Sequence, residues 1–231
     1  ADTPGLAEEV AFFTSRYHAP MRVDDLRAVC ERMQAVFPRF KEAGYRVGPN
    51  HLATTGHHDE NLAAALGPGL RRQVGLDGQT CQGALCPADP DVLAYVRECY
   101  ELLVMTDPDF VWIDDDVRLS GHMPTSGCCV CEYCVSDMSR RMGETFSHAS
   151  LVAAMDDPDD ARRSDVRRQF LLRNVDVLRN LMVVIEGVVH GADPKTELGF
   201  MTGDRFWEGY DFAGIAEILR GNTTTDVRWR P

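Results

Sequence analysis

Four cysteines have the spacing of a metal site. Three of them follow the pattern C-x-C-x-x-C between residues 129 and 134, and a fourth precedes a proline. A tight loop directs three sulfurs to a common centre, and a distant fourth thiolate completes the tetrahedral set of a structural zinc site. We therefore predict a structural zinc ion, held partly by a loop near 117–136, with an iron–sulfur cluster as the alternative. The predicted ligands are Cys86, Cys129, Cys131 and Cys134.

A cluster of carboxylates follows directly on a short apolar segment. Residues 110–113 read Phe-Val-Trp-Ile, the composition of a buried strand, and lead into Asp114, Asp115 and Asp116. Barrel enzymes place their catalytic residues at the C-terminal ends of buried parallel strands. We expect at least one of these aspartates to act in catalysis or ligand binding, and a solvated acidic loop is the alternative. If the alternation of the strand continues, Asp114 and Asp116 share a face and Asp115 points away from it.

A parallel sheet is needed to position these residues. Short apolar segments alternate with longer segments of helical periodicity, which is typical of βα units. The predicted strands are 10–14, 46–52, 110–113, 198–201 and 227–229, and the predicted helices are 23–40, 90–103, 164–191 and 212–219. A loop rich in glycine and proline is predicted from 53 to 86. The aspartate-rich segment 156–160 is predicted to be an exposed loop, with a calcium site as the alternative.

Five strands do not complete a barrel. A (β/α)₈ barrel typically needs about 250 residues, whereas this chain has 231. An open parallel sheet leaves edge backbone and apolar surface uncovered. We therefore predict one α/β domain over 1–231 that is an incomplete TIM barrel, and a smaller open α/β domain is the alternative.

The composition restricts the partners. A formal charge of −12 opposes binding to nucleic acid. No segment approaches the roughly 20 consecutive apolar residues of a membrane span, and the first residues have no basic and apolar regions of a signal peptide. The eight cysteines cluster as metal ligands do, unlike those of a small secreted disulfide scaffold. These features favour a cytoplasmic protein without nucleic-acid or membrane partners, and leave a homo-oligomer open.

Three segments resemble the family-42 β-galactosidases, retaining glycosidases built on a TIM barrel. Residues 76–78 and 86–90 are similar to the family's D-x-x-G stretch leading to C-P-N-S-P. Residues 112–116 are similar to its W-x-I-D-N-E strand end, offset by one residue, and 129–134 are similar to its C-x-C-x-x-C zinc loop. On this register the five predicted strands are barrel strands two to six.

The resemblance implies glycoside hydrolysis by carboxylate acid/base chemistry. Asp116 stands at the position of the family's acid/base glutamate, and Asp115 replaces a neighbouring asparagine that binds the sugar. Aspartate is one methylene shorter than glutamate, and a reach error of about 1 Å can cost on the order of 10²-fold in rate. The family's nucleophile, a glutamate that ends strand seven, would fall beyond Pro231. The further residues expected to contact a carbohydrate are Asp114, Arg118, His57, Asp204, Trp207 and Trp229.

Several contacts and functions stay open at this stage. Arg118 is close enough in sequence to pair with Asp116. The chain could instead be a non-catalytic carbohydrate-binding or regulatory barrel whose altered aspartates no longer cleave sugars. A third interpretation is metal-assisted hydrolysis by His57, His58 and the aspartates, which requires a second metal ion.

Overall fold

A five-stranded parallel sheet forms the centre of the computed structural model, which describes residues 7–67, 69–201 and 206–230. The strand order is β1-β2-β5-β6-β7, and every neighbouring pair is parallel. The strands are β1 (Glu9–Phe13), β2 (Arg46–His51), β5 (Phe110–Ile113), β6 (Glu197–Met201) and β7 (Arg228–Arg230). All five predicted strands are confirmed to within one or two residues.

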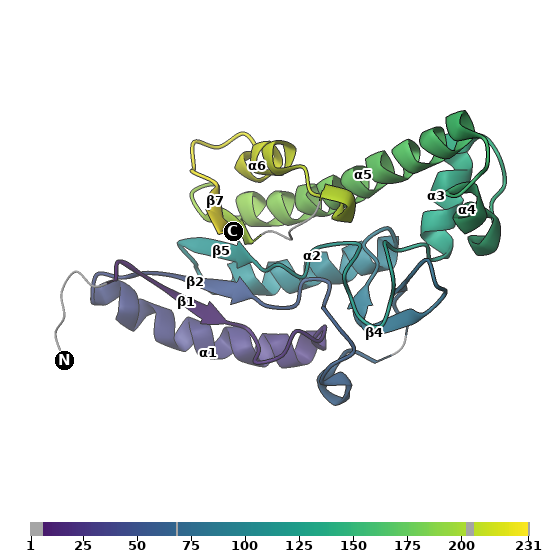
Figure 1. Cartoon of the computed structure of the whole chain (residues 1–231). Helices are drawn as coiled ribbons and strands as arrows, with labels where there is room; N and C mark the ends of the chain where they lie inside the picture. Colours follow the sequence, from purple (N-terminus) through teal and green to yellow (C-terminus); the bar gives the residue numbers. More distant parts are fainter. Residues whose placement is uncertain (1–6, 68, 202–205, 231) are drawn as a thin grey trace.

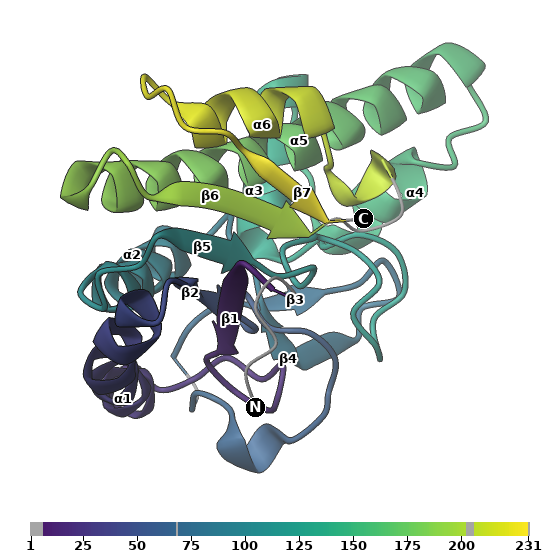
Figure 2. The same cartoon turned by 90° about the vertical axis from the view of Figure 1, so that its left-hand side faces the viewer.

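Four helices cover one face of this sheet (Figures 1 and 2). They are α1 (Val23–Glu42), α2 (Pro90–Val104), α5 (Asp160–Ala192) and α6 (Phe212–Arg220). Asp89 caps α2 by accepting a hydrogen bond from the N–H of Asp91. The main core lies between the sheet and these helices, because Val111, Ile113 and Leu198 are fully buried against them. The helices therefore form the outer layer of a βα arrangement.

The opposite face of the sheet carries charged side chains. Arg46, on β2, pairs with Glu9 and with Glu197 at 2.9 Å each. Arg228 pairs with the same two glutamates. Glu9 lies on the first strand of the sheet and Arg228 on the last, so the sheet curls until its two edge strands contact each other across this concave face. The described residues form an arc of a barrel that does not close, because β1 and β7 both remain edge strands.

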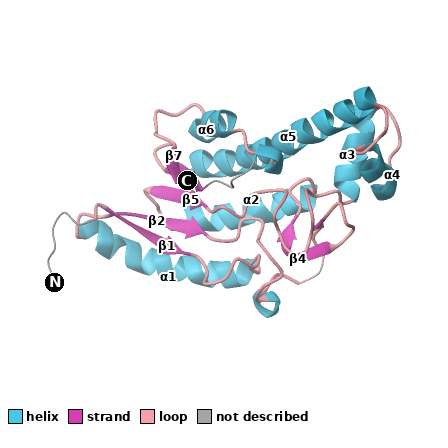
Figure 3. Ribbon diagram, in the orientation of Figure 1, coloured by secondary structure: helices cyan, strands magenta, loops and turns pink. Residues whose placement is uncertain are grey.

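Additional elements lie beyond the C-terminal ends of the strands (Figure 3). Part of the predicted loop 53–86 is an antiparallel hairpin of β3 (Arg72–Val74) and β4 (Thr80–Leu85), preceded by a short 3₁₀ helix, η1 (Leu62–Ala64). Two further helices, α3 (Glu132–Met142) and α4 (His148–Ala154), and a 3₁₀ turn, η2 (Phe206–Glu208), were also not predicted. A strand of three residues and helices of two to three turns leave little periodicity in the sequence.

The start of α5 was predicted four or five residues too late. The helix begins at Asp160, because Asp159 accepts hydrogen bonds from the N–H groups of Ala161 and Arg162. The neighbouring carboxylates of the aspartate-rich segment pair with arginines of α5, as in Asp157–Arg162 at 3.1 Å. These acidic residues therefore cap and pair with a helix. Within the described ranges, no helix is long and apolar enough to cross a membrane.

Candidate functional site

The four predicted metal ligands converge. Cys86 directly follows β4, Cys131 is the N-cap residue of α3, and Cys134 lies in the first turn of that helix. Their sulfurs, with that of Cys129, all lie within 4.8 Å of one another. The Sγ of Cys134 is 3.6 Å from that of Cys86, 3.4 Å from that of Cys131 and 3.6 Å from that of Cys129. Cys86, which follows the hairpin, thus lies close to three cysteines of a loop and helix about 45 positions later in the sequence.

The sulfur spacing suits a tetrahedral ion. Zinc–sulfur bonds of about 2.3 Å put the sulfurs of a tetrahedral site about 3.8 Å apart, whereas a disulfide needs about 2.05 Å. All eight cysteines are free thiols, and each of these four is at most 3% exposed. Hydrogen bonds from the other three thiols, together with burial, raise the pKa of Cys86 well above its ordinary value. All four cysteines would therefore be deprotonated together only if a cation were bound between them. These four sulfurs can hold such a cation.

A buried arginine contacts the cysteine cluster. Arg173, on α5, is fully buried and donates from Nη2 to the Sγ of Cys134 at 2.6 Å. Its Nη1 donates to Oδ1 of Asn174 at 2.8 Å. Burial alone would lower the pKa of Arg173, but the adjacent sulfurs raise it, so the guanidinium stays charged. The sequence did carry a signal for this residue: Arg173 lies three positions after Phe170, on the apolar stripe of α5.

Asp114 lies at the C-terminal end of β5, on the concave face of the sheet. It is 4% exposed, and its Oδ2 accepts a hydrogen bond from Nδ2 of Asn50 on β2 at 2.5 Å. Its Oδ1 accepts the N–H of Asp115 at 2.9 Å. Burial raises the pKa of Asp114, although Asn50 lowers it, and the neighbouring carboxylate of Asp115 adds to the rise. Asp114 therefore holds a proton more strongly than an ordinary aspartate does.

Asp116 has a different environment from the other two aspartates. Its side chain is fully buried, and Oδ2 accepts the backbone N–H groups of Thr55 at 2.5 Å and Gly56 at 2.7 Å. Burial raises the pKa of Asp116 well above its usual range, although these two N–H groups lower it. The carboxylate anchors the loop that follows β2, so its acid/base role stays a prediction that this burial does not favour.

Arg118 joins two of the predicted site residues. Its Nη1 lies 3.6 Å from Oδ2 of Asp115, and its Nη2 contacts Nε2 of His57. The expected pairing of Arg118 with Asp116 is therefore wrong, because Asp116 turns toward the β2 loop. Burial, and then the Arg118 guanidinium, lower the pKa of His57 to about 3. His57 is accordingly neutral at physiological pH.

Two more histidines adjoin His57. The rings of His57 and His58 are 3.8 Å apart between centroids, and those of His57 and His122 are 5.3 Å apart. His122, which is fully buried, was not identified from the sequence, because it stands alone in a polar loop with no ligand-like spacing. The predicted site residues Asp115, Arg118 and His57 thus form one cluster with His58 and His122. We refer to these five residues as the histidine cluster.

The remaining predicted residues lie elsewhere. Trp229, 58% exposed, packs against Phe212 at the start of α6 and is therefore on the helix-bearing side of β7. Its neighbour Arg230 reaches the concave face, where the guanidinium lies over the ring of Trp112. Trp207 is in η2, beside the cysteine loop, and its carbonyl accepts from the Sγ of Cys128 at 3.0 Å. Asp204 lies outside the described residues.

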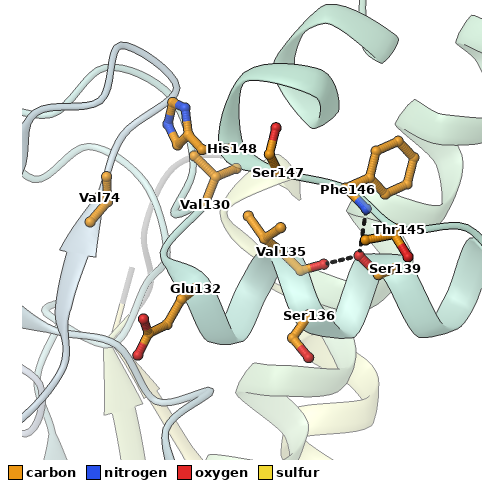
Figure 4. A pocket seen from close by; sticks show the side chains of 10 residues that line it. All are labelled: Val74, Val130, Glu132, Val135, Ser136, Ser139, Thr145, Phe146, Ser147 and His148. Carbon is orange, nitrogen blue, oxygen red and sulfur yellow. Dashed lines mark hydrogen bonds between the residues drawn. The ribbon is translucent and has the colours of Figure 1, made fainter.

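An apolar pocket of about 590 Å³ lies between the hairpin, α3 and the segment that leads into α4 (Figure 4). Val74, Val130 and Val135 form one part of its wall, and Phe146 and His148, at the start of α4, form another. Of the predicted site residues that the structure describes, none lines this pocket. The carboxylates and this pocket are therefore separate features.

Comparisons with known proteins show that this chain has a similar fold to some solved structures, and they show nothing further. No protein-family profile and no curated protein sequence matches the chain. Among solved structures, the catalytic domain of β-amylase from Paenibacillus polymyxa superimposes with a TM-score of 0.57 at 13% identity, over 96% of this chain and 68% of that one.

Two β-galactosidases give similar values. The enzyme from Rahnella sp. R3 has a TM-score of 0.54 at 15% identity, and that from Bacillus circulans sp. alkalophilus has 0.53 at 13%. Each comparison covers 87% of this chain, which spans only 31% and 32% of those two enzymes. The chain is thus similar in fold to part of several TIM-barrel glycoside hydrolases.

Proposed function

We propose that this chain is a segment of a glycoside-hydrolase-type barrel that acts on a carbohydrate through carboxylate acid/base chemistry. The observation that supports it best is the Asp114–Asp115 pair at the C-terminal end of a central parallel strand, facing a polar concave surface. This is the position at which TIM barrels carry their chemistry. The fold of the similar solved structures agrees with it.

The environments of the two aspartates suggest separate roles. Asp114 retains a proton more strongly because it is buried and faces a second carboxylate. A protonated carboxylic acid at this place can donate to the leaving oxygen of a glycosidic bond. Arg118 lies within 3.6 Å of Asp115 and can balance its charge. We assign the general acid to this pair, with Asp114 as the reacting group and Asp116 as the anchor of the adjacent loop.

The second carboxylate of a glycosidase sets its stereochemistry. A retaining enzyme holds a nucleophile about 5 Å from the acid, whereas an inverting enzyme separates the two groups by about 6.5–9.5 Å. The retaining, β-galactosidase-like assignment rests on the sequence resemblance. On that register, β1, β2, β5, β6 and β7 correspond to barrel strands two to six.

The cysteine cluster is proposed to hold structural zinc. Four buried sulfurs match the closed ligand set of such sites, which leaves no position for a reacting water. Cys86, Cys129, Cys131 and Cys134 would join the hairpin to α3, and Arg173 would balance part of the charge of the four thiolates. The ion would thereby fix the loop that leads from Asp116 to α3 at the mouth of the barrel.

A non-catalytic carbohydrate-binding barrel is the second candidate. The burial of Asp116 favours it, because the carboxylate at the family's acid/base position is occupied by two backbone N–H groups. In that case Trp112 and Arg230, which stack on the concave face, would contribute to a sugar-binding surface.

Parallel assays of hydrolysis and binding separate these functions. Because the resemblance places the nucleophile beyond Pro231, the protein would be tested together with any encoded segment that follows this chain, against a panel of aryl glycosides and oligosaccharides. Sugar binding would be followed by calorimetry. An enzyme requires hydrolysis that Asp114→Asn abolishes and the exposed control Asp24→Asn does not. Binding without hydrolysis in the wild type favours the second candidate. Neither hydrolysis nor binding across the panel would contradict both.

A further inference from the structure

Three imidazole rings meet where two loops leave the sheet. His57 and His58 follow β2, and His122 lies on the loop after β5. One ring nitrogen from each lies within 4.8 Å of one from each of the others. The three residues contribute no ligand to the cysteine cluster, so they form a separate group of metal-binding side chains.

Two ring nitrogens of this group are buried without a partner. Nε2 of His122 lies 3.1 Å from the carbonyl oxygen of Arg118, and because a carbonyl only accepts, the ring proton is on Nε2. Nδ1 of His122 therefore carries a lone pair, and it has no hydrogen-bond partner. Nδ1 of His57 also has none. Buried polar atoms are rarely left unsatisfied, because each costs free energy.

We propose that His57, His58 and His122 form a second metal site, distinct from the cysteine cluster, for a divalent ion that prefers imidazole, such as Zn²⁺, Ni²⁺ or Co²⁺. His122 has the arrangement typical of a ligand, in which one ring nitrogen donates to a backbone carbonyl and the other is free for the metal. Three protein ligands leave a coordination position open to a water or a sugar hydroxyl. That position would lie beside Arg118 and Asp115.

The present contacts of the three histidines show how far each must rearrange before it can bind an ion. His122 can bind without any rearrangement. His57 accepts from Arg118 at Nε2, so its ring proton is on Nδ1. It binds an ion only when Arg118 withdraws, and Asp115 lies 3.6 Å from Nη1 to receive that guanidinium. His58 accepts the N–H of Met123 at Nδ1, 2.9 Å away, so it must turn its ring and contributes least.

Arg118 is consequently a competitor of the metal. Its charge repels a cation, and its Nη2 occupies a nitrogen of His57. The carbonyl that orients His122 belongs to the backbone of Arg118 and survives any substitution there. Replacing Arg118 by methionine should therefore tighten metal binding, an effect opposite to that expected from loss of a merely structural contact.

Cobalt titration of the full chain tests the proposal independently of any glycosidase activity. Protein purified with one equivalent of zinc would be titrated with Co²⁺ and followed by calorimetry and absorption. We expect one further ion, with d–d absorption but without sulfur-to-cobalt charge transfer, since its ligands are nitrogens. His122→Ala removes a ligand and should weaken this binding by more than the roughly 10- to 100-fold typical of losing an outer-shell partner, whereas the control His148→Ala should not change it.

Arg118→Met supplies a test that does not depend on removing a buried ring. It should tighten binding of the further Co²⁺ by about tenfold, because a nearby positive charge is removed. Binding of no further ion by the zinc-loaded wild type would overturn the proposal. So would unchanged binding in a folded His122→Ala variant, weaker binding in Arg118→Met, or a charge-transfer band that places the ion on cysteine.

Discussion

The cysteine cluster and the histidine cluster sit at the same end of the sheet but are positioned in different ways. The cysteines belong to the end of β4, a loop and the first turn of α3, and a charged arginine from α5 contacts them. The histidine cluster lies on loops, and buried ring nitrogens of His57 and His122 have no partner. The cysteine cluster thus has the features of a structural site. The histidine cluster retains buried polar atoms without hydrogen-bond partners, which is typical of sites that bind a ligand.

Removing a cysteine ligand should have the largest effect. If the cluster holds structural zinc as proposed, Cys134→Ser breaks a closed tetrahedral site whose metal would contribute directly to folding. We therefore expect loss of bound zinc and a fall in Tm of more than about 10 °C. The control is Cys30→Ala, which removes a buried thiol of α1 outside the cluster. Elemental analysis and thermal denaturation measure both. Full zinc content and an unchanged Tm in Cys134→Ser would show that the two regions do not differ in this way.

Arg173→Leu should come next. Removing one member of a buried charge pair costs about 3–5 kcal/mol of unfolding free energy, and the cluster would also release zinc to a chelator faster. Arg173→Lys keeps the charge without the planar fork and should recover part of both losses. Denaturant unfolding and the rate of zinc release report these changes. Equal zinc release from wild type and Arg173→Leu would contradict charge balance by Arg173.

Asp114→Asn tests, through activity, the region beside the histidine cluster. If Asp114 is the general acid, the rate of hydrolysis should fall by about 10²- to 10⁴-fold, while the zinc content stays constant. Because the pKa of Asp114 is raised, activity should be present at low pH and decline as the pH rises through that value. A pH–rate profile of wild type and variant measures this. A variant with wild-type activity would exclude Asp114 as the acid.

Asp116 should give the smallest change, and one that depends on pH. Asp116→Ala leaves the N–H groups of Thr55 and Gly56 unpaired and should cost about 1–3 kcal/mol, whereas Asp116→Asn keeps an acceptor and should cost less. Since burial raises the pKa in the folded state, the stability that the protonated group contributes is complete below the unfolded value of about 3.9. It is lost as the pH rises from there through the folded pKa.

Denaturation of these variants across a pH series measures that effect. The decline should become smaller in Asp116→Asn, because the asparagine does not titrate, while Asp114, whose pKa is also raised, still contributes. A wild-type protein and an Asp116→Asn variant with the same pH dependence would show that Asp116 is not buried as described.

Local spacing and periodicity made much of the architecture predictable. The five strands and the C-x-C-x-x-C loop follow from patterns within short segments, and the cysteine that precedes a proline, Cys86, converges with this loop as predicted. The burial of Asp116 does not, because it depends on the backbone of Thr55 and Gly56, some 60 residues earlier. His122 enters its cluster only through the meeting of two loops, and no pattern in the sequence links those loops.

The pairing of Glu9 with Arg228 has a consequence for the order of events during synthesis. The two residues are 219 positions apart, so this partner of Glu9 is synthesised long after Glu9 itself. Until then Arg46 is the cation that faces both Glu9 and Glu197, and the hollow of the sheet carries excess negative charge. Docking of β7 neutralises that excess. The hollow should therefore stay loosely packed and hydrated until β7 has been synthesised and has docked.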